Sequence, residues 1–245
     1  MLRETAFEVN GELLTPDPSG ALWWACERTL IFADIHFEKG SSYARRGSLL
    51  PPYDTRATLA RLTDVLVERK PARVIALGDS FHDGEAAERL DPPERVALHD
   101  LVRLTDWIWI EGNHDPKPPA WLGGTVANEV GIGGLLFRHE PQSALQPGEI
   151  AGHLHPCATV RLRGRSIRRR CFISDGQRAI LPSFGAYTGG LDVRDSAISS
   201  LFPQSYLTYL LGSRRVYAAG SKTAAQQYWR KDQNGVPQTA TAEAS

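Results

Sequence analysis

Thr29-Leu-Ile-Phe-Ala33 is an apolar run that leads into Asp34-Ile-His36. A second run of this kind, Arg73-Val-Ile-Ala-Leu77, leads into Gly78-Asp79. Short, continuous apolar runs bounded by turn residues are typical of buried strands. The two stretches therefore predict neighbouring strands that carry polar side chains at their ends.

The residues between these runs have helical periodicity. Leu59, Leu62, Val65 and Leu66 fall on one face, which predicts a helix over 54–70. A second helix is predicted over 93–105, ahead of a strand at 107–110. Alternating strands and helices predict βαβ units and a mainly parallel sheet. Such sheets bind ligands at the carboxyl ends of their strands.

The sequence changes character after Asn113, where glycine-rich turns separate short apolar stretches. These stretches, at 134–138, 149–152, 159–162 and 179–181, predict a second sheet packed on the first. From residue 219 onward no apolar period remains. We therefore expect a single domain over 1–218 and a weakly ordered tail over 219–245.

Composition indicates an ordinary globular protein. Of its 245 residues 42% are hydrophobic and 23% charged, and basic and acidic residues balance at 28 each. The chain has no overall positive charge that would indicate binding to nucleic acid. A nucleic-acid partner would therefore need a local patch of basic residues. There are three cysteines, an odd number, and none has Cys-x-x-Cys spacing: Cys26, Cys157 and Cys171. This pattern argues against a disulfide framework and against a zinc site with thiolate ligands. With no signal-like apolar start, we expect a cytoplasmic location.

Five polar clusters follow the predicted strands. They are Asp34-Ile-His36, Gly78-Asp79, Gly112-Asn-His-Asp115, His139-Glu140 and Gly152-His-Leu-His155. The Asp-x-His and His-x-His spacings would put both side chains on one side of an extended chain, and the glycines permit tight turns. Each cluster alone is ordinary turn chemistry. Together they predict a metal centre, and mixed imidazole, carboxylate and amide-oxygen ligands suit manganese, iron, zinc or nickel. Two such ions side by side would lower the pKa of a bridging water.

In this order the clusters resemble the calcineurin-like metallophosphoesterases. The resemblance implies an α/β fold in which two mixed β-sheets pack as a sandwich flanked by α-helices, a four-layer αββα arrangement. It implies one metal held by Asp34, His36 and His155, another held by Asn113, His139 and His153, and Asp79 bridging the two. It also implies that His114 faces the substrate and that Asp115 orients it. His139-Glu140 departs from the family's usual His-Gly.

Further stretches are similar to the bacterial ligase-associated endonucleases of the PdeM group. They include Phe37-Glu-Lys-Gly40, Leu50-Pro-Pro52, Arg138-His-Glu-Pro141, Leu181-Pro-Ser-Phe-Gly185 and Thr188-Gly-Gly190. This resemblance implies a DNA-repair phosphodiesterase or endonuclease that uses two Mn(II) ions. It also implies association with a DNA ligase, a helicase of the Lhr type and a nuclease-like protein.

Candidate substrate contacts lie outside these clusters. They are Arg45, Arg46, His82, Arg161 and Arg163, the last two within an arginine-rich run over 161–170. Such a run can contact phosphates, but it is nearly as typical of a solvated strand pair. Cys157 and Cys171 flank the last histidines and are interpreted as small buried hydrophobes rather than ligands.

Three functions remain open from the sequence. The first is a phosphodiesterase or endonuclease acting on DNA, which an open basic groove would favour. The second is a phosphoesterase acting on a small nucleotide or a phosphomonoester, which a closed pocket would favour. The third is an inactive scaffold for repair partners, which the complete ligand set disfavours. The sequence leaves the oligomeric state open.

Overall fold

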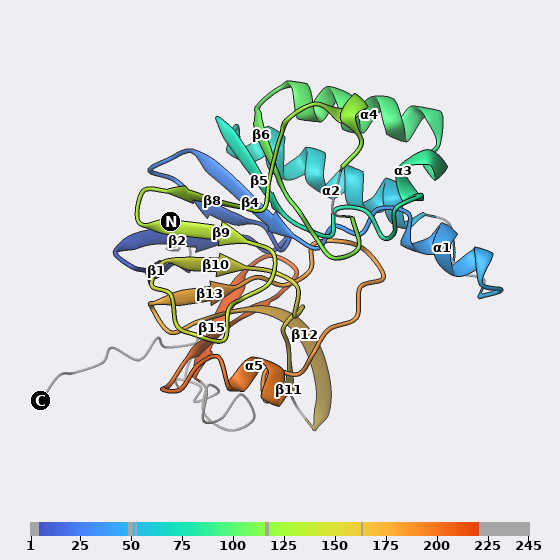
Figure 1. Ribbon diagram of the computed structural model, residues 1–245. Helices are drawn as coiled ribbons and strands as arrows, with labels where there is room; N and C mark the ends of the chain where they lie inside the picture. The colour runs from blue at the N-terminus through green and yellow to red at the C-terminus, as the bar shows by residue number, and fades with distance from the viewer. Residues whose placement is uncertain (1–4, 49–50, 52, 116–117, 163, 221–245) are drawn as a thin grey trace, which may run out of the picture.

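The computed structural model describes the whole chain except residues 1–4, 49–50, 52, 116–117, 163 and 221–245. Two β-sheets lie face to face (Figure 1). The helices α2 (Asp54–Arg69) and α4 (Pro92–Arg103) cover the outer side of the first sheet, and α5 (Ser196–Ser199) lies against the second. This confirms the expected αββα sandwich.

The first sheet has the strand order β1-β2-β3-β4-β5-β6-β7. Its strands are β1 (Phe7–Val9), β2 (Glu12–Pro16), β3 (Leu22–Trp24), β4 (Thr29–Ala33), β5 (Arg73–Leu77), β6 (Asp106–Ile110) and β7 (Thr125–Ala127). Pairing is parallel from β4 to β7 and antiparallel from β1 to β4. The carboxyl ends of β4, β5 and β6 therefore meet at one edge.

The second sheet has the order β15-β14-β12-β13-β10-β9-β8. Its strands are β8 (Glu129–Ile132), β9 (Leu135–Arg138), β10 (Glu149–Ala151), β12 (Arg165–Ser174), β13 (Arg178–Ile180), β14 (Leu207–Leu211) and β15 (Val216–Gly220). A further strand, β11 (Cys157–Leu162), pairs with the first half of β12 in a projecting hairpin (Figure 1). Parallel pairing of β9, β10 and β13 brings their carboxyl ends together.

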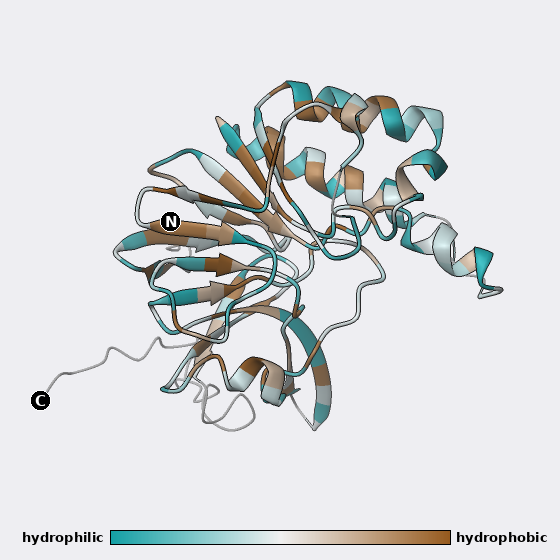
Figure 2. Cartoon of the chain, in the orientation of Figure 1, coloured by the Kyte–Doolittle hydropathy of each residue, from teal (hydrophilic) through white to brown (hydrophobic). Residues whose placement is uncertain are grey.

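Three hydrophobic clusters fill the spaces between the layers. Along β6, Trp107 and Trp109 face the helices, whereas Ile108 and Ile110 face the second sheet. Both faces of the central strands are thus buried, which explains their unbroken apolar sequences. Hydropathy colouring shows these strands as brown and the outer faces of the helices as largely teal (Figure 2).

The remaining helices of the described chain are short. They are α1 (Lys39–Arg45), α3 (Ala86–Arg89) and the 3-10 turn η1 (Ala120–Leu122). None of the helices in the described part of the chain is long and apolar enough to cross a membrane. The last strand reaches Gly220, two residues beyond the expected domain end, and the rest of the predicted tail lies outside the described residues.

Candidate metal centre

The predicted ligands come from both sheets. Asp34 and His36 follow β4, Asp79 follows β5, and Asn113 follows β6. From the second sheet, His139 follows β9, and His153 and His155 follow β10. Because all these strands point their carboxyl ends to the same edge, seven side chains distant in sequence converge at the seam between the sheets.

The backbone at these residues is not extended, contrary to the strand-like geometry expected for Asp-x-His and His-x-His. Left-handed φ values occur at Asp34 (53°), His36 (48°), Asp79 (46°), His153 (66°) and His155 (45°). β4 ends at Ala33 and β10 at Ala151, so strand alternation does not apply beyond them. The paired side chains converge through left-handed turns, which non-glycine residues adopt at an energetic cost.

The first ligand group consists of Asp34, His36 and His155. Their ligand atoms all lie within 4.8 Å of one another. Oδ1 of Asp34 is 3.1 Å from Nε2 of His155, and Nε2 of His155 is 3.4 Å from Nε2 of His36. The composition of this group is the one that the family resemblance implies.

The second group consists of Asp79, His139 and His153, whose ligand atoms also lie within 4.8 Å. Nδ1 of His153 is 3.2 Å from Nε2 of His139, and Oδ1 of Asn113 is 2.8 Å from the same Nε2. The Nδ1 atom of His139 lies 2.9 Å from the Leu77 carbonyl, to which it donates. That bond leaves Nε2 of His139 with its lone pair turned to the group.

Asp79 lies between the two groups. Its Oδ2 is 3.9 Å from Nε2 of His36, and its Oδ1 is 3.5 Å from Nε2 of His139. The backbone N–H of His114 also donates to Oδ1, which fixes the carboxylate. This position suits a carboxylate that bridges two cations.

The residues fit a pair of divalent ions. Imidazole nitrogens approach one another at 3.2–3.4 Å, where two lone pairs repel unless a proton or a cation lies between them. Burial, with the nearby charges of His155 and Lys39, lowers the pKa of His36 to about 2, so its ring is neutral, the form that binds metal. At His155 burial lowers the pKa, but the hydrogen bond and charge of Asp34 outweigh it, and the net shift is upward.

Three glycines make room for this convergence, as the sequence predicts. A Cβ on Gly78 would overlap the His139 ring, and one on Gly112 would overlap Asp79. A Cβ on Gly152 would meet the carboxylate of Asp34. The close approach of ligand side chains is a reason that these positions need glycine, and Gly78 also has a left-handed φ of 69°.

His114 lies beside the ligand groups with a partly exposed ring. Its Nε2 is 4.0 Å from Oδ2 of Asp79, and its side chain is 43% exposed. Nδ1 lies 3.0 Å from the carbonyl oxygen of His82 and donates to it, so Nε2 is the ring nitrogen that is left free of this bond. Sequence reasoning gave the orienting role to Asp115, and in the structure the His82 carbonyl takes it.

Asp115 instead supports the backbone. It is buried, and its Oδ2 accepts from the N–H of Phe81 at 2.9 Å. Burial raises the pKa of Asp115 to about 8, with the negative charge of Asp79 acting in the same direction and the backbone hydrogen bond opposing it. Asp115 thus holds the loop that follows Asp79 and makes no described hydrogen bond to His114.

The predicted substrate contacts are divided between two regions. His82 stacks between Tyr43 and His114, and Arg45 and Arg46 lie nearby at the end of α1. Arg161 is exposed on the projecting β11–β12 hairpin, and Arg163 lies outside the described residues. Other arginines of that run are engaged: Arg168 donates to the Gly190 carbonyl, and Arg170 donates to the Ser183 carbonyl.

One charged residue that sequence reasoning left without a role is Lys39. It is only 9% exposed, yet the described part of the chain gives its ammonium no ion pair and no hydrogen bond. Burial lowers the pKa of Lys39, and Asp34, Asp54 and Asp79 counteract this through their charges. The sequence shows only that Lys39 comes three residues after His36. The structure shows that its charge lies near those of Asp34 and Asp79.

Two smaller predictions can be compared with the structure. Cys157 and Cys171 are buried, and Cys171 lies in the apolar cluster beneath α5, in agreement with the interpretation as small hydrophobes. Glu140 is exposed, whereas Pro141 is buried. The departure from His-Gly therefore leaves His139 in its place.

A family model described as calcineurin-like phosphoesterase matches residues 27–163, which contain every ligand named above. The chain belongs to this family. Members are metal-dependent phosphoester hydrolases with a binuclear divalent metal centre, and the two ligand groups are where such a centre would lie.

Solved structures add a nuclease to the comparison. The chain is 32% identical to Pseudomonas putida nuclease MPE, with a TM-score of 0.68, over 88% of this chain and 100% of that chain. Yfce, a phosphoesterase from E. coli, is 13% identical with a TM-score of 0.39, over 78% and 97% of the two chains. A search of curated proteins gave no match.

Proposed function

We propose that the protein is a DNA phosphodiesterase that cuts internal bonds, with Asp34, His36 and His155 holding one ion and Asn113, His139 and His153 the other. The observation that carries the proposal is Asp79, whose two oxygens face one group each. The 32% identity to a nuclease supports a nucleic acid as the substrate, and the resemblance to the ligase-associated endonucleases favours DNA.

When bound, two divalent ions lower the pKa of water and neutralise phosphoryl oxygens. The chain's own residues do the rest. His114, held by the His82 carbonyl, presents Nε2 to the leaving oxygen. In its doubly protonated, imidazolium form it can donate the Nε2 proton to that oxygen and become the neutral ring. The ammonium of Lys39 offsets negative charge on the non-bridging oxygens of the phosphate. Oδ1 of Asp79 accepts from the backbone N–H of His114 and so fixes His114 relative to the metal ligands.

The proposal extends to the physiological setting. By resemblance we assign Mn(II) as the metal, with iron, zinc and nickel as alternatives that the same ligands would accept. By the same resemblance we assign a role in DNA repair with a DNA ligase, an Lhr-type helicase and a nuclease-like protein. The free cysteines support a cytoplasmic location.

The first test compares an aryl phosphodiester with an aryl phosphomonoester. Metal-free protein is reconstituted with manganese, and Asp79→Ala serves as the metal-site control. We expect manganese-dependent cleavage of the diester that the variant loses, followed by nicking of a closed circular DNA. A preference for the monoester would instead support the small-nucleotide phosphoesterase, and no turnover with any metal would support the scaffold.

A second variant separates chemistry from metal binding. His114→Asn removes the proton donor but none of the metal ligands. We expect turnover of the diester to fall about 100-fold or more, within the usual range for general acids, while bound manganese stays unchanged. Loss of metal in parallel with activity would remove His114 from the proposed role.

A further inference from the structure

The projecting β11–β12 hairpin carries positive charge that no acid of its own offsets (Figure 1). All the charged residues over 157–170 are arginines. Arg161 and Arg165 are exposed, and within the described chain neither has a side-chain hydrogen bond or an ion pair. The carboxylate of Asp192 lies near Arg168 but is already paired with Arg194 at 2.7 Å. Because like charges repel, an anion that binds to this hairpin stabilises it.

The register of the hairpin places three arginines on one face. Arg170, Arg168 and Ser166 alternate along β12 and therefore point to the same side. Arg161 of β11 pairs with Ser166, and residues paired across antiparallel strands also share a side. Arg170, Arg168 and Arg161 thus follow one another from the base of the hairpin to its tip. We call these three residues the arginine row.

The base of the arginine row contacts the loop that follows β13. Arg170 donates to the Ser183 carbonyl at 2.6 Å, and Arg168 donates to the Gly190 carbonyl. These bonds fix both guanidinium groups against the loop. Arg161 lies beyond them, where its guanidinium is exposed.

The same loop touches two ligands of the first metal group. The N–H of Gly185 donates to the Asp34 carbonyl at 3.1 Å. Gly190 lies against His155, since a Cβ on this glycine would be 2.1 Å from the His155 carbonyl oxygen. The arginine row therefore begins beside the metal centre and leads away from it.

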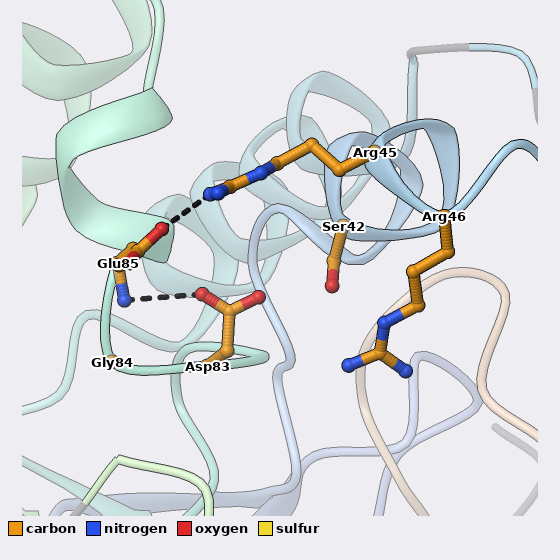
Figure 3. Close-up of a pocket in the computed structure, with 6 residues that line it drawn as sticks. All are labelled: Ser42, Arg45, Arg46, Asp83, Gly84 and Glu85. Atoms are coloured by element: carbon orange, nitrogen blue, oxygen red, sulfur yellow. Dashed lines mark hydrogen bonds and ion pairs between the residues drawn. The ribbon is translucent and has the colours of Figure 1, made fainter.

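The cavity beside α1 differs from the hairpin in its charge. It has a volume of about 570 Å³ and lies between the end of α1 and the loop after β5 (Figure 3). Its charged lining residues are two arginines and two acids: Arg45, Arg46, Asp83 and Glu85. Arg45 is paired with Glu85, and Asp83 accepts from Arg89 at 2.7–2.8 Å. The cavity thus lacks the excess of positive charge that the hairpin has.

We propose that the arginine row binds the phosphate backbone of a nucleic acid whose scissile bond lies at the metal centre. The proposal rests on the proposed function and deepens it, because it gives the direction in which the substrate leaves the site. Residues on one face of a strand are about 7 Å apart, so the row can contact phosphates beyond the scissile one. Contacts to phosphate carry no sequence information, so the row should bind any base sequence.

Binding of a labelled oligonucleotide to the metal-free full chain, measured over a series of salt concentrations, tests the row without turnover. Arg161→Gln removes the exposed guanidinium at the tip. We expect weaker binding and a salt slope reduced by about 1, as for the loss of one phosphate contact. Arg161→Lys keeps a positive charge at the same place and should retain the slope.

Arg165→Gln is the matched control. Arg165 is exposed at the same end of the hairpin, but it is one residue from Ser166 and so points to the opposite face. We expect this variant to keep the wild-type salt slope. Equal reductions in Arg161→Gln and Arg165→Gln would show only a general attraction to the hairpin and would overturn the row. A reduced slope in Arg46→Gln with an unchanged slope in Arg161→Gln would place the backbone along α1 and would overturn it too.

The outcome can be separated from that of the proposed function. If the oligonucleotide binds with the expected dependence on Arg161, but manganese-loaded protein cleaves only aryl diesters, the arginine row stands and the nuclease assignment fails. If the protein nicks closed circular DNA but Arg161→Gln binds and cleaves as the wild type does, the nuclease assignment stands and the arginine row fails.

Discussion

Single residues at the metal centre carry backbone strain that neighbouring hydrogen bonds hold in place. A left-handed conformation costs a non-glycine residue about 1–3 kcal/mol. The N–H of His36 donates to the Asp79 carbonyl at 2.9 Å, and the N–H of His153 donates to Oδ2 of Asp34 at 2.9 Å. His36 and His153 are thus each held by the backbone or carboxylate of another ligand, which fixes their positions without a metal.

Lys39 allows a test at the scale of one side chain. The residue is 9% exposed and its ammonium has no ion pair within the described chain, and a phosphoryl group would supply the counter-charge. Lys39→Met should therefore lower kcat for the diester by about 100-fold, as the loss of one electrostatic contact in a transition state does, with bound metal unchanged. Lys70→Met, at the exposed end of α2, is the matched control. A parallel loss of metal would make the role of Lys39 structural.

At the scale of elements, the loop after β13 supports the first ligand group. The N–H of Phe184 donates to the Ala33 carbonyl at 2.7 Å, and that of Gly185 donates to the Asp34 carbonyl at 3.1 Å. Arg61 of α2 and Arg170 of β12 both donate to the carbonyl of Phe184. This loop contributes no residue to the two ligand groups but fixes the chain on which Asp34 and His36 lie.

Gly185→Ala tests this support. A Cβ at Gly185 would overlap the carbonyl oxygen of Ile35, the residue between Asp34 and His36. We expect the overlap to destabilise the protein by about 1–3 kcal/mol and to weaken manganese binding. Both effects are measured by urea unfolding and by metal titration. Gly189→Ala, where nothing lies within 4 Å of the added carbon, should leave both unchanged.

The elements that sequence predicts best are those buried on both faces. β4 and β5 have the predicted bounds, since their apolar runs end where polar ligands begin. The strands β1 and β3 are three residues long each and show no comparable run, so only pairing with neighbours defines them. The residues that the structure brings together in the two groups could be predicted from their order along the chain. The left-handed turns and the His82 carbonyl could not, because both depend on contacts between segments distant in sequence.

For the whole molecule, stability should fall at alkaline pH because of Tyr209. Burial raises the pKa of this phenol, which lies between the sheets, to about 12. Unfolded tyrosine titrates near pH 10, so the stabilising contribution is complete below about pH 10 and is lost as pH rises toward 12. Tyr209→Phe should flatten the decline of unfolding free energy between pH 9 and about 11.5, measured by urea titration. An unchanged pH slope would contradict this assignment.

The metal centre also lies where it can join the two sheets. Asp34 and Asp79 follow strands of the first sheet, and His139 and His153 follow strands of the second, so an ion held by both sets would link the layers at one end. A ligand at 100 times its dissociation constant stabilises a fold by about 2.7 kcal/mol, which raises the Tm of a domain of this size by about 5–10 °C. We therefore expect manganese to raise the Tm of metal-free protein by that amount, measured by calorimetry. Asp79→Asn, which keeps the shape but removes the charge between the groups, should abolish most of the rise. A metal-dependent rise of the same size in Asp79→Asn would show that the ions bind elsewhere.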